Sequence, residues 1–281
     1  MEKKEKQVWL ITGASSGFGK AFAEYAISKG YNVIVTARRT DKLAAIKELA
    51  PDQVEAIRMD VTDSKEITAA MEQAILRFNR IDVLINNAGY GIVGAVEETA
   101  EEELRAQMET NFFGAVAVIK TIIPQFRKQK SGAIVNISSL GGQLSYPGFG
   151  AYSASKFALE GISEALAAEL APFGIKVLIV EPGQFRTELA GAAMKHMPEI
   201  EAYKDTVGKI RDFAKTMGGT QEGDPLKAAA AIDKALNAET TPLRLQLGKD
   251  AIDAIRQHSA TLLKDLAEWE PVALNTRIAD V

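Results

Sequence analysis

Short apolar runs, rich in β-branched residues, alternate along most of this sequence with longer segments of helical periodicity. The runs hold few polar side chains, which is typical of parallel strands covered by helices on both faces. We therefore predict an α/β protein with a doubly wound parallel sheet of about seven strands and helices on both faces. The predicted strands are residues 8–12, 32–36, 54–59, 83–86, 133–138, 176–181 and 243–247, and the predicted helices are 17–29, 41–49, 64–78, 101–123 and 151–171.

Charge and cysteine content exclude several classes of protein. The 281 residues include 33 Lys and Arg against 37 Asp and Glu, which gives a formal net charge of −4. Because this balance provides no basic excess to neutralise phosphates, we expect no nucleic-acid partner. The chain has no cysteine, which excludes thiolate metal sites and cysteine nucleophiles. His196 and His258 are the only histidines, so we expect no metal site.

The N-terminal segment carries no signal for export. Residues 1–6 are mostly charged, and the apolar run at 8–12 is shorter than the ~7–15 residues of a secretory signal. No apolar run approaches the ~18 residues of a membrane-spanning helix. We expect a cytoplasmic protein without a membrane span.

The strand–helix alternation is interrupted once, between residues 188 and 224. This stretch is rich in Ala, Met, Lys and Gly and shows no strand pattern. It is too short for a domain and too long for a turn. We predict a single nucleotide-binding domain over residues 1–281, with a substrate lid inserted at about 184–223 and a C-terminal extension after about residue 249.

Three glycines follow the first predicted strand and lead into a helix. Gly13, Gly17 and Gly19 have the spacing G-x-x-x-G-x-G. Glycine permits positive φ and lets the backbone approach a pyrophosphate at the positive end of a helix. Three glycines can also form an ordinary tight turn, but the strand–helix context favours phosphate binding.

The second predicted strand ends in Arg38 and Arg39, with no acid before Asp41. An acid at this position would bind the ribose 2′-hydroxyl of NAD, whereas arginine suits the 2′-phosphate of NADP. Both arginines could instead be solvated loop residues. We predict that NADP(H) is preferred over NAD(H).

Tyr152 and Lys156 stand four residues apart near a helix start and share one face. A phenol titrates near ~10, too high for an acid or base at neutral pH, and a neighbouring ammonium lowers that pKa. Such a pair is often only a solvent-exposed contact. Here it follows a strand that ends in Ser138 and Ser139, so a proton-transfer site is predicted.

Six motifs in order resemble the short-chain dehydrogenase/reductase family in its compact, non-extended branch. The resemblance covers roughly residues 7–190 and implies a Rossmann fold. The C-terminal tail is most similar to members that act on steroids and retinoids. The motifs are Thr12-Gly-x-x-x-Gly-x-Gly19, Asn86-Asn87-Ala88-Gly89, Asn111, Ile137-Ser138-Ser139, Tyr152-Ser-Ala-Ser-Lys156 and Pro182-Gly183.

The resemblance implies a role for each matching residue. Ser139, rather than Ser138, would bind the substrate carbonyl, and Tyr152 would exchange the proton. Lys156 would hold the nicotinamide ribose and lower the tyrosine pKa, and Asn111 would support a proton relay through a local helix distortion. The residues expected to bind the cofactor are Gly13, Ser15, Ser16, Gly17, Phe18, Gly19, Arg38, Asp60, Val61, Asn87, Ala88, Gly89, Tyr152, Lys156, Pro182, Gly183 and Thr187.

Function is expected to be NADP(H)-dependent interconversion of a ketone or aldehyde with its alcohol. The substrate is expected to be apolar, because apolar and methionine side chains dominate the expected pocket walls. The family further implies a homodimer or homotetramer, assembled through the helices at 101–123 and 151–170. An alternative is a non-catalytic dinucleotide sensor on the same scaffold, although such a protein would not need Ser139, Tyr152 and Lys156 together.

Overall fold

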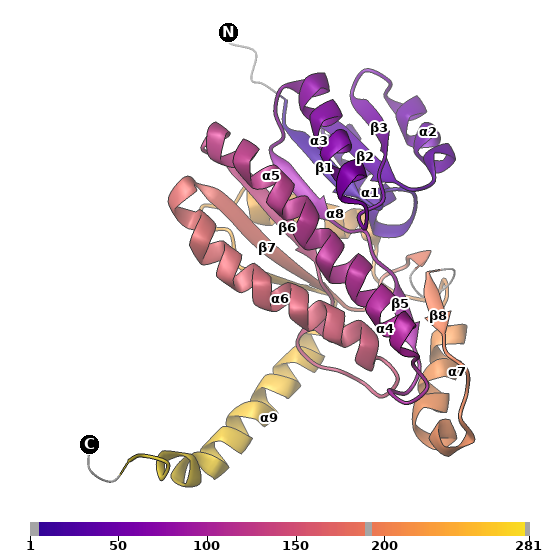
Figure 1. Cartoon of the computed structure of the whole chain (residues 1–281), viewed down its shortest axis with the longest axis vertical. Helices are drawn as coiled ribbons and strands as arrows, with labels where there is room; N and C mark the ends of the chain where they lie inside the picture. The colour runs from indigo at the N-terminus through magenta and orange to yellow at the C-terminus, as the bar shows by residue number, and fades with distance from the viewer. Residues whose placement is uncertain (1–5, 189–192, 279–281) are drawn as a thin grey trace.

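The computed structural model describes residues 6–188 and 193–278, and its central feature is a seven-stranded parallel sheet (Figure 1). The strand order is β3-β2-β1-β4-β6-β7-β9. The predicted doubly wound sheet is therefore confirmed. Its strands are β1 Val8–Thr12, β2 Asn32–Ala37, β3 Val54–Arg58, β4 Val83–Asn86, β6 Gly132–Ile137, β7 Ile175–Pro182 and β9 Arg244–Leu247.

Both faces of the sheet are buried, as the apolar strands predict. In β1, Trp9 and Ile11 point into one core cluster, whereas Val8 and Leu10 point into the other. Successive side chains of a strand point to opposite faces, so a strand that is apolar throughout supplies both cores. The first core is covered by α1 Gly17–Ser28, α2 Thr40–Leu49 and α8 Pro225–Leu236, and the second by α3 Ser64–Phe78, α5 Ala115–Gln129 and α6 Gly150–Leu170.

The order of the strands reverses beside β1, which pairs with β2 on one side and β4 on the other. The connections that follow β1 and β4 leave toward opposite faces of the sheet, and a crevice opens at the carboxyl ends of these two strands. The turn after β1 and the loops after β4 and β6 lie at this edge. The fold thereby places the predicted site residues together.

The segment predicted as one helix over 101–123 consists of three parts. α4 Glu101–Met108 is followed by a π-helix, Glu109–Gly114, and then by α5. Gly114 lies against the loop after β3, since a Cβ there would be 2.8 Å from Val61 Cγ2. The distortion expected around Asn111 is this π-helix.

The insertion contains a strand, and the expectation of none was wrong. β8 Met194–His196 pairs in parallel with β5 Gly91–Val93 to form a separate two-stranded sheet. Three residues are too few to show an alternating pattern. The rest of the insertion includes Glu201–Tyr203, Lys204–Gly208 and α7 Lys209–Thr216. Residues 189–192 of the predicted lid lie outside the described residues.

The C-terminal extension is a 26-residue helix, α9 Lys249–Leu274. Figure 1 shows that it extends away from the sheet and its flanking helices. Across the described residues, no helix is both long and apolar enough to span a membrane. The prediction about export rests partly on residues 1–5. These lie outside the described residues.

Candidate active site

A cleft of about 1350 Å³ opens at the carboxyl ends of the strands. Its walls come from the turn after β1, the loops after β2, β3, β4, β6 and β7, the start of α6, and the insertion. All but two of the predicted site residues line it. Those that do are Gly13, Ser15, Ser16, Gly17, Phe18, Arg38, Asp60, Val61, Asn87, Ala88, Gly89, Ser139, Tyr152, Lys156, Pro182, Gly183 and Thr187.

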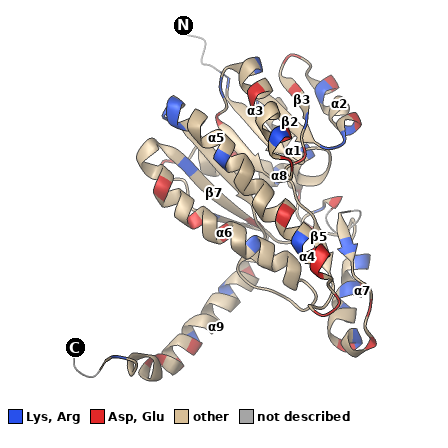
Figure 2. Ribbon diagram, viewed as in Figure 1, with Lys and Arg blue, Asp and Glu red and all other residues tan. Residues whose placement is uncertain are grey.

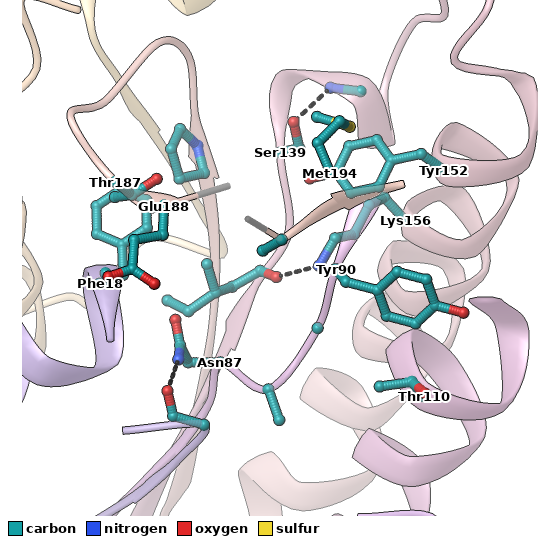
Figure 3. A pocket seen from close by; sticks show the side chains of 18 of the residues that line it. Phe18, Asn87, Tyr90, Thr110, Ser139, Tyr152, Lys156, Thr187, Glu188 and Met194 are labelled. Atoms are coloured by element: carbon teal, nitrogen blue, oxygen red, sulfur yellow. Dashed lines mark hydrogen bonds between the residues drawn. The ribbon is translucent and has the colours of Figure 1, made fainter. Parts of the chain in front are cut away.

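Tyr152 and Ser139 meet in the cleft. Tyr152 lies in the first turn of α6, Ser139 is the second residue after β6, and their side chains are hydrogen-bonded to each other. Figure 3 shows both side chains on the opposite side of the view from Phe18. Burial raises the pKa of the Tyr152 phenol, and the bond with Ser139 opposes that rise. Tyr152 is therefore protonated at neutral pH.

Lys156 lies one helical turn further along α6 and is 6% exposed. Its Nζ donates a 2.8 Å hydrogen bond to the carbonyl of Ile137 and lies 5.7 Å from the centre of the Tyr152 ring. Burial lowers the pKa of Lys156 to about 8, and the nearby Glu160 carboxylate acts in the opposite direction. The net shift of the Tyr152 pKa is upward, with burial as its largest cause, and Lys156 is not among the groups that shift it.

The two serines after β6 have different partners. Ser138 is 3% exposed, and its Oγ donates a 2.6 Å hydrogen bond to Glu160 Oε1 on α6. Ser139 Oγ accepts a hydrogen bond from the Gly141 amide at 3.1 Å. The Ser139 hydroxyl, which also contacts Tyr152, lies in the cleft, and its role toward a substrate carbonyl stays a prediction.

Asn111 is not among the residues that line the cleft, and its role in a proton relay stays a prediction. It is 1% exposed in the π-helix, and its side chain bonds both backbone groups of Tyr90 at 3.0 and 3.1 Å. Its Nδ2 also lies 3.1 Å from Ser155 Oγ, which in turn donates to the Tyr152 carbonyl at 2.7 Å. The π-helix turns this side chain toward the loop after β4, so Asn111 orients residues that do line the cleft.

The glycine turn leaves the backbone at the start of α1 accessible. Gly13 and Gly17 have φ of +65° and +52°, and a Cβ at Gly13 would lie 2.7 Å from Ala88 Cα. Ser16 caps α1 without a side-chain bond. Asn87 Nδ2 donates to the carbonyls of Thr12 and Gly13 and holds the turn against the loop after β4. Free amides at a helix start form a site for an anion.

Gly19 is the second predicted residue that does not line the cleft. A Cβ at this position would lie 2.5 Å from the Gly13 carbonyl and 2.6 Å from Asn87 Nδ2. Its role is therefore close packing of α1 beneath the turn rather than direct contact with a ligand.

Two arginines stand at the end of the cleft formed by β2. Arg38 and Arg39 both line it, and Arg39 Nη2 lies 3.5 Å from Ser15 Oγ. Asp60 lies nearby. Burial raises the pKa of its carboxyl group, whereas hydrogen bonds from the Thr62 amide and hydroxyl and the charge of Arg38 lower it. The lowering effects are larger in sum, so the net shift of the pKa is downward. Here the cleft carries positive charge beside one ionised carboxylate.

Two contacts at the cleft join residues from distant parts of the chain. Asp250, at the start of α9, accepts a 2.7 Å hydrogen bond from the amide of Gln184, in the loop after β7. Lys195 in the insertion forms an ion pair with Glu103 on α4, and both residues line the cleft. No spacing rule in the sequence connects these pairs.

Comparison with known proteins places this geometry in a family. Residues 7–198 match the family model described as short chain dehydrogenase. The chain is 42% identical over 250 residues to a protein named 3-ketodihydrosphingosine reductase from Bacteroides thetaiotaomicron, covering 87% of this chain and 88% of that protein. It is 51% identical to a short-chain dehydrogenase of known structure from Streptomyces avermitilis, with a TM-score of 0.93 and coverage of 98% and 100%.

Two more distant solved structures carry a nicotinamide dinucleotide. A short-chain dehydrogenase from Burkholderia cenocepacia J2315, in complex with NADP, is 26% identical, with a TM-score of 0.74 and coverage of 94% and 97%. A 3-ketoacyl-(acyl-carrier-protein) reductase from Brucella melitensis, complexed with NADH, is 27% identical, with a TM-score of 0.74 and coverage of 87% and 97%. The chain therefore belongs to the short-chain dehydrogenase family and is an oxidoreductase that acts on alcohol and carbonyl groups.

Proposed function

We propose that this protein interconverts a ketone or aldehyde and the corresponding alcohol with NADP(H), and that Tyr152 exchanges the proton. The observation that carries the proposal is the contact between Tyr152 and Ser139 in the cleft, with Lys156 on the same face of α6. A protonated phenol and a second hydroxyl beside it can both donate hydrogen bonds to one carbonyl oxygen. A protein that only sensed a dinucleotide would not need this arrangement.

The residues present fit a nicotinamide dinucleotide. Ser16, Gly17 and Phe18 line the cleft at the start of α1, so the turn suits a pyrophosphate. Arg38 and Arg39 would hold a 2′-phosphate, because guanidinium groups bind phosphate oxygens in pairs. The related structures hold NADP in one case and NADH in the other, so the two arginines are the basis for NADP(H).

Different side chains of this protein would have different roles in the reduction. The bound dinucleotide supplies the hydride. Ser139 would donate a hydrogen bond to the carbonyl oxygen and fix its position, and Tyr152 would give the same oxygen its proton. Lys156 would hold the nicotinamide ribose with its ammonium. In the direction of oxidation, the same phenol oxygen would take the proton back.

The insertion would select the substrate as a lid at about 184–223. The part of the cleft near Tyr152 is walled largely by apolar side chains from the insertion and from the loop before α6. A wall of this kind favours an apolar ketone over a sugar or an acid. The Bacteroides relative is named for a 3-keto lipid, which supports a carbonyl on an alkyl chain. These walls include Leu140, Tyr146, Phe149, Met194, Ile210, Phe213 and Met217.

The same proposal covers the remaining expectations from the sequence. We place the protein in the cytoplasm, as a single domain over residues 1–281 that assembles into a homodimer or homotetramer. α5 and α6 are the helices through which the family resemblance implies this assembly. Both helices cover the same face of the sheet.

The test is oxidation of NADPH with a panel of carbonyl compounds of increasing chain length. Tyr152→Phe removes the proton donor but leaves the shape of the cleft, so we expect the wild type to turn over apolar ketones and the variant to lose about 100-fold or more in kcat. Tyr31→Phe, which removes a hydroxyl bonded to Asp233 outside the cleft, is the matched control. If NADPH binds, as followed by its fluorescence, and no carbonyl is reduced, the sensor alternative is favoured.

A further inference from the structure

α9 carries an apolar stripe that begins on the body of the protein and continues into solvent. Ala251 and Ile255 are buried against the body, with 0% and 9% of their surface exposed. Beyond them, Leu262, Leu266 and Trp269 are 55%, 64% and 63% exposed. The same face of one helix is therefore core at its start and open surface over its outer half, as the projection of α9 in Figure 1 shows.

The stripe has the spacing of a helix that pairs with another helix. Its members recur alternately four and three residues apart, which is the heptad pattern of a two-helix seam. The one hydroxyl in the seam, Ser259 Oγ, donates a 2.8 Å hydrogen bond to the Ile255 carbonyl, so it can be covered without losing a partner. The seam positions are Ile255, Ser259, Leu262, Leu266, Trp269 and Ala273.

The outer half of α9 has no support from the rest of the protein. Every described side chain from 259 to 274 is exposed, and Pro271 removes one backbone bond near the end of the helix. A helix of about 16 residues without tertiary contacts is marginal in water, because its stability normally comes from packing of an apolar face. A stable α9 therefore requires a cover for the stripe.

Charge distribution indicates what this cover is. The outer half holds Asp265, Glu268 and Glu270 against a single base, Lys264 (Figure 2). The inner half is balanced, with Lys249 and Arg256 against Asp250 and Asp253, and Arg256 lies 3.5 Å from Asp253 in an exposed pair that can exchange partners at little cost. This excess of acids disfavours an anionic lipid surface, which binds helices rich in Lys and Arg. A second α9 running antiparallel would place the acidic end of each helix beside the arginine of the other.

The register of such a pair follows from the seam. With a two-fold axis near residue 264, Leu262 of one helix meets Leu266 of its partner, and Ser259 meets Trp269. Arg256 and Glu270 both flank the seam on the same side, seven residues before and seven residues after Leu263. Each Arg256 would then lie beside Glu270 of the other copy.

We propose that the exposed stripe of α9 is the binding surface for a second copy of this chain, with the two α9 helices paired antiparallel. This contact is separate from any contact through α5 and α6, and it does not depend on the reaction at the cleft. It gives the C-terminal extension a role in assembly.

The first test is the molar mass of the full-length protein by sedimentation velocity over a range of concentrations. Leu266→Glu would place a carboxylate in the seam of both copies, so we expect one association step to weaken by about 100-fold or more. Leu76→Glu, at a residue of α3 that is 87% exposed, is the matched control and should leave the mass unchanged. An unchanged mass for Leu266→Glu would overturn the proposal.

Charge reversal tests the orientation without changing the apolar seam. Arg256→Glu and Glu270→Arg should each weaken the same step by about tenfold, since each creates like-charge contacts. The double variant should recover most of the wild-type affinity, because each reversed pair is again attractive in an antiparallel dimer. If the double variant associates no better than the single ones, the antiparallel pairing is wrong.

Discussion

Arg211 on α7 donates a 2.8 Å hydrogen bond to the carboxylate of Glu98, and both side chains are almost completely buried. The same carboxylate accepts bonds from the amides of Ala95 and Ile200, at 2.6 and 2.8 Å. Burial raises the pKa of Glu98, but these bonds and the guanidinium together lower it by more, so the net shift is downward. Glu98 precedes α4, so the ion pair joins the insertion to the main body of the domain.

Removal of the arginine should destabilise the protein strongly. Arg211→Met leaves a buried carboxylate without its cation, which costs about 3–5 kcal/mol in the free energy of unfolding. Lys215→Met is the matched control, because Lys215 lies on the same helix as Arg211 and forms an exposed ion pair with Glu199, so its loss should cost less than about 1 kcal/mol. Urea denaturation of both variants measures the difference, and equal losses would show that the buried pair does not anchor the insertion.

Arg38 should determine which dinucleotide the protein prefers. Arg38→Ser removes a guanidinium from the cleft, so we expect the KM for NADPH to rise about 10- to 100-fold, with less than about threefold change for NADH. Arg127→Ser on α5, outside the cleft, serves as the control. Initial rates with both dinucleotides measure the effect. A clear preference of the wild type for NADH would contradict the assignment.

Glu160 should make stability depend on pH near neutrality. Its pKa is raised to about 7, chiefly by burial and further by the neighbouring Glu181, although bonds with Ser138 and Arg244 oppose the rise. The folded protein therefore holds a proton that the unfolded chain releases at lower pH, so the free energy of unfolding falls as pH rises from about 4.5 to about 7. In Glu160→Gln this fall should be smaller.

The measurement is the Tm of both proteins between about pH 5 and about pH 8. The Tm of Glu160→Gln minus that of the wild type should increase as pH rises. Glu164→Gln is the control, since Glu164 is an exposed partner of the same Arg244. Curves for Glu160→Gln and the wild type that stay parallel throughout would contradict the assigned pKa shift.

The sheet and most of the cleft could be predicted because their signals are local. An apolar strand such as 8–12 is buried on both faces wherever it occurs, and the position of Tyr152 four residues before Lys156 places both on one side of a helix. The loops after parallel strands meet at one edge of the sheet, so Ser139 and Asn87 could both be predicted to lie at that edge.

The remaining features depend on contacts between distant parts of the chain. β8 is a strand only because β5 pairs with it, and three residues carry no periodicity of their own. The π-helix was expected only through the family resemblance, and Gly114 within it packs closely against the distant Val61. The position of Asp250 depends on how the start of α9 packs against the loop after β7. The pKa of Tyr152 depends on how deeply the phenol is buried, which the spacing of two residues does not contain.

Transfer of deuterium from NADPH to product tests hydride transfer and the role of Tyr152 together. With both hydrogens at C4 of the nicotinamide replaced by deuterium, the wild type should reduce an apolar ketone to an alcohol with one deuterium on the former carbonyl carbon. Mass spectrometry of the product detects it. Tyr152→Phe should bind the same dinucleotide and form almost no labelled alcohol. Labelled alcohol formed by Tyr152→Phe at the wild-type rate would contradict the account.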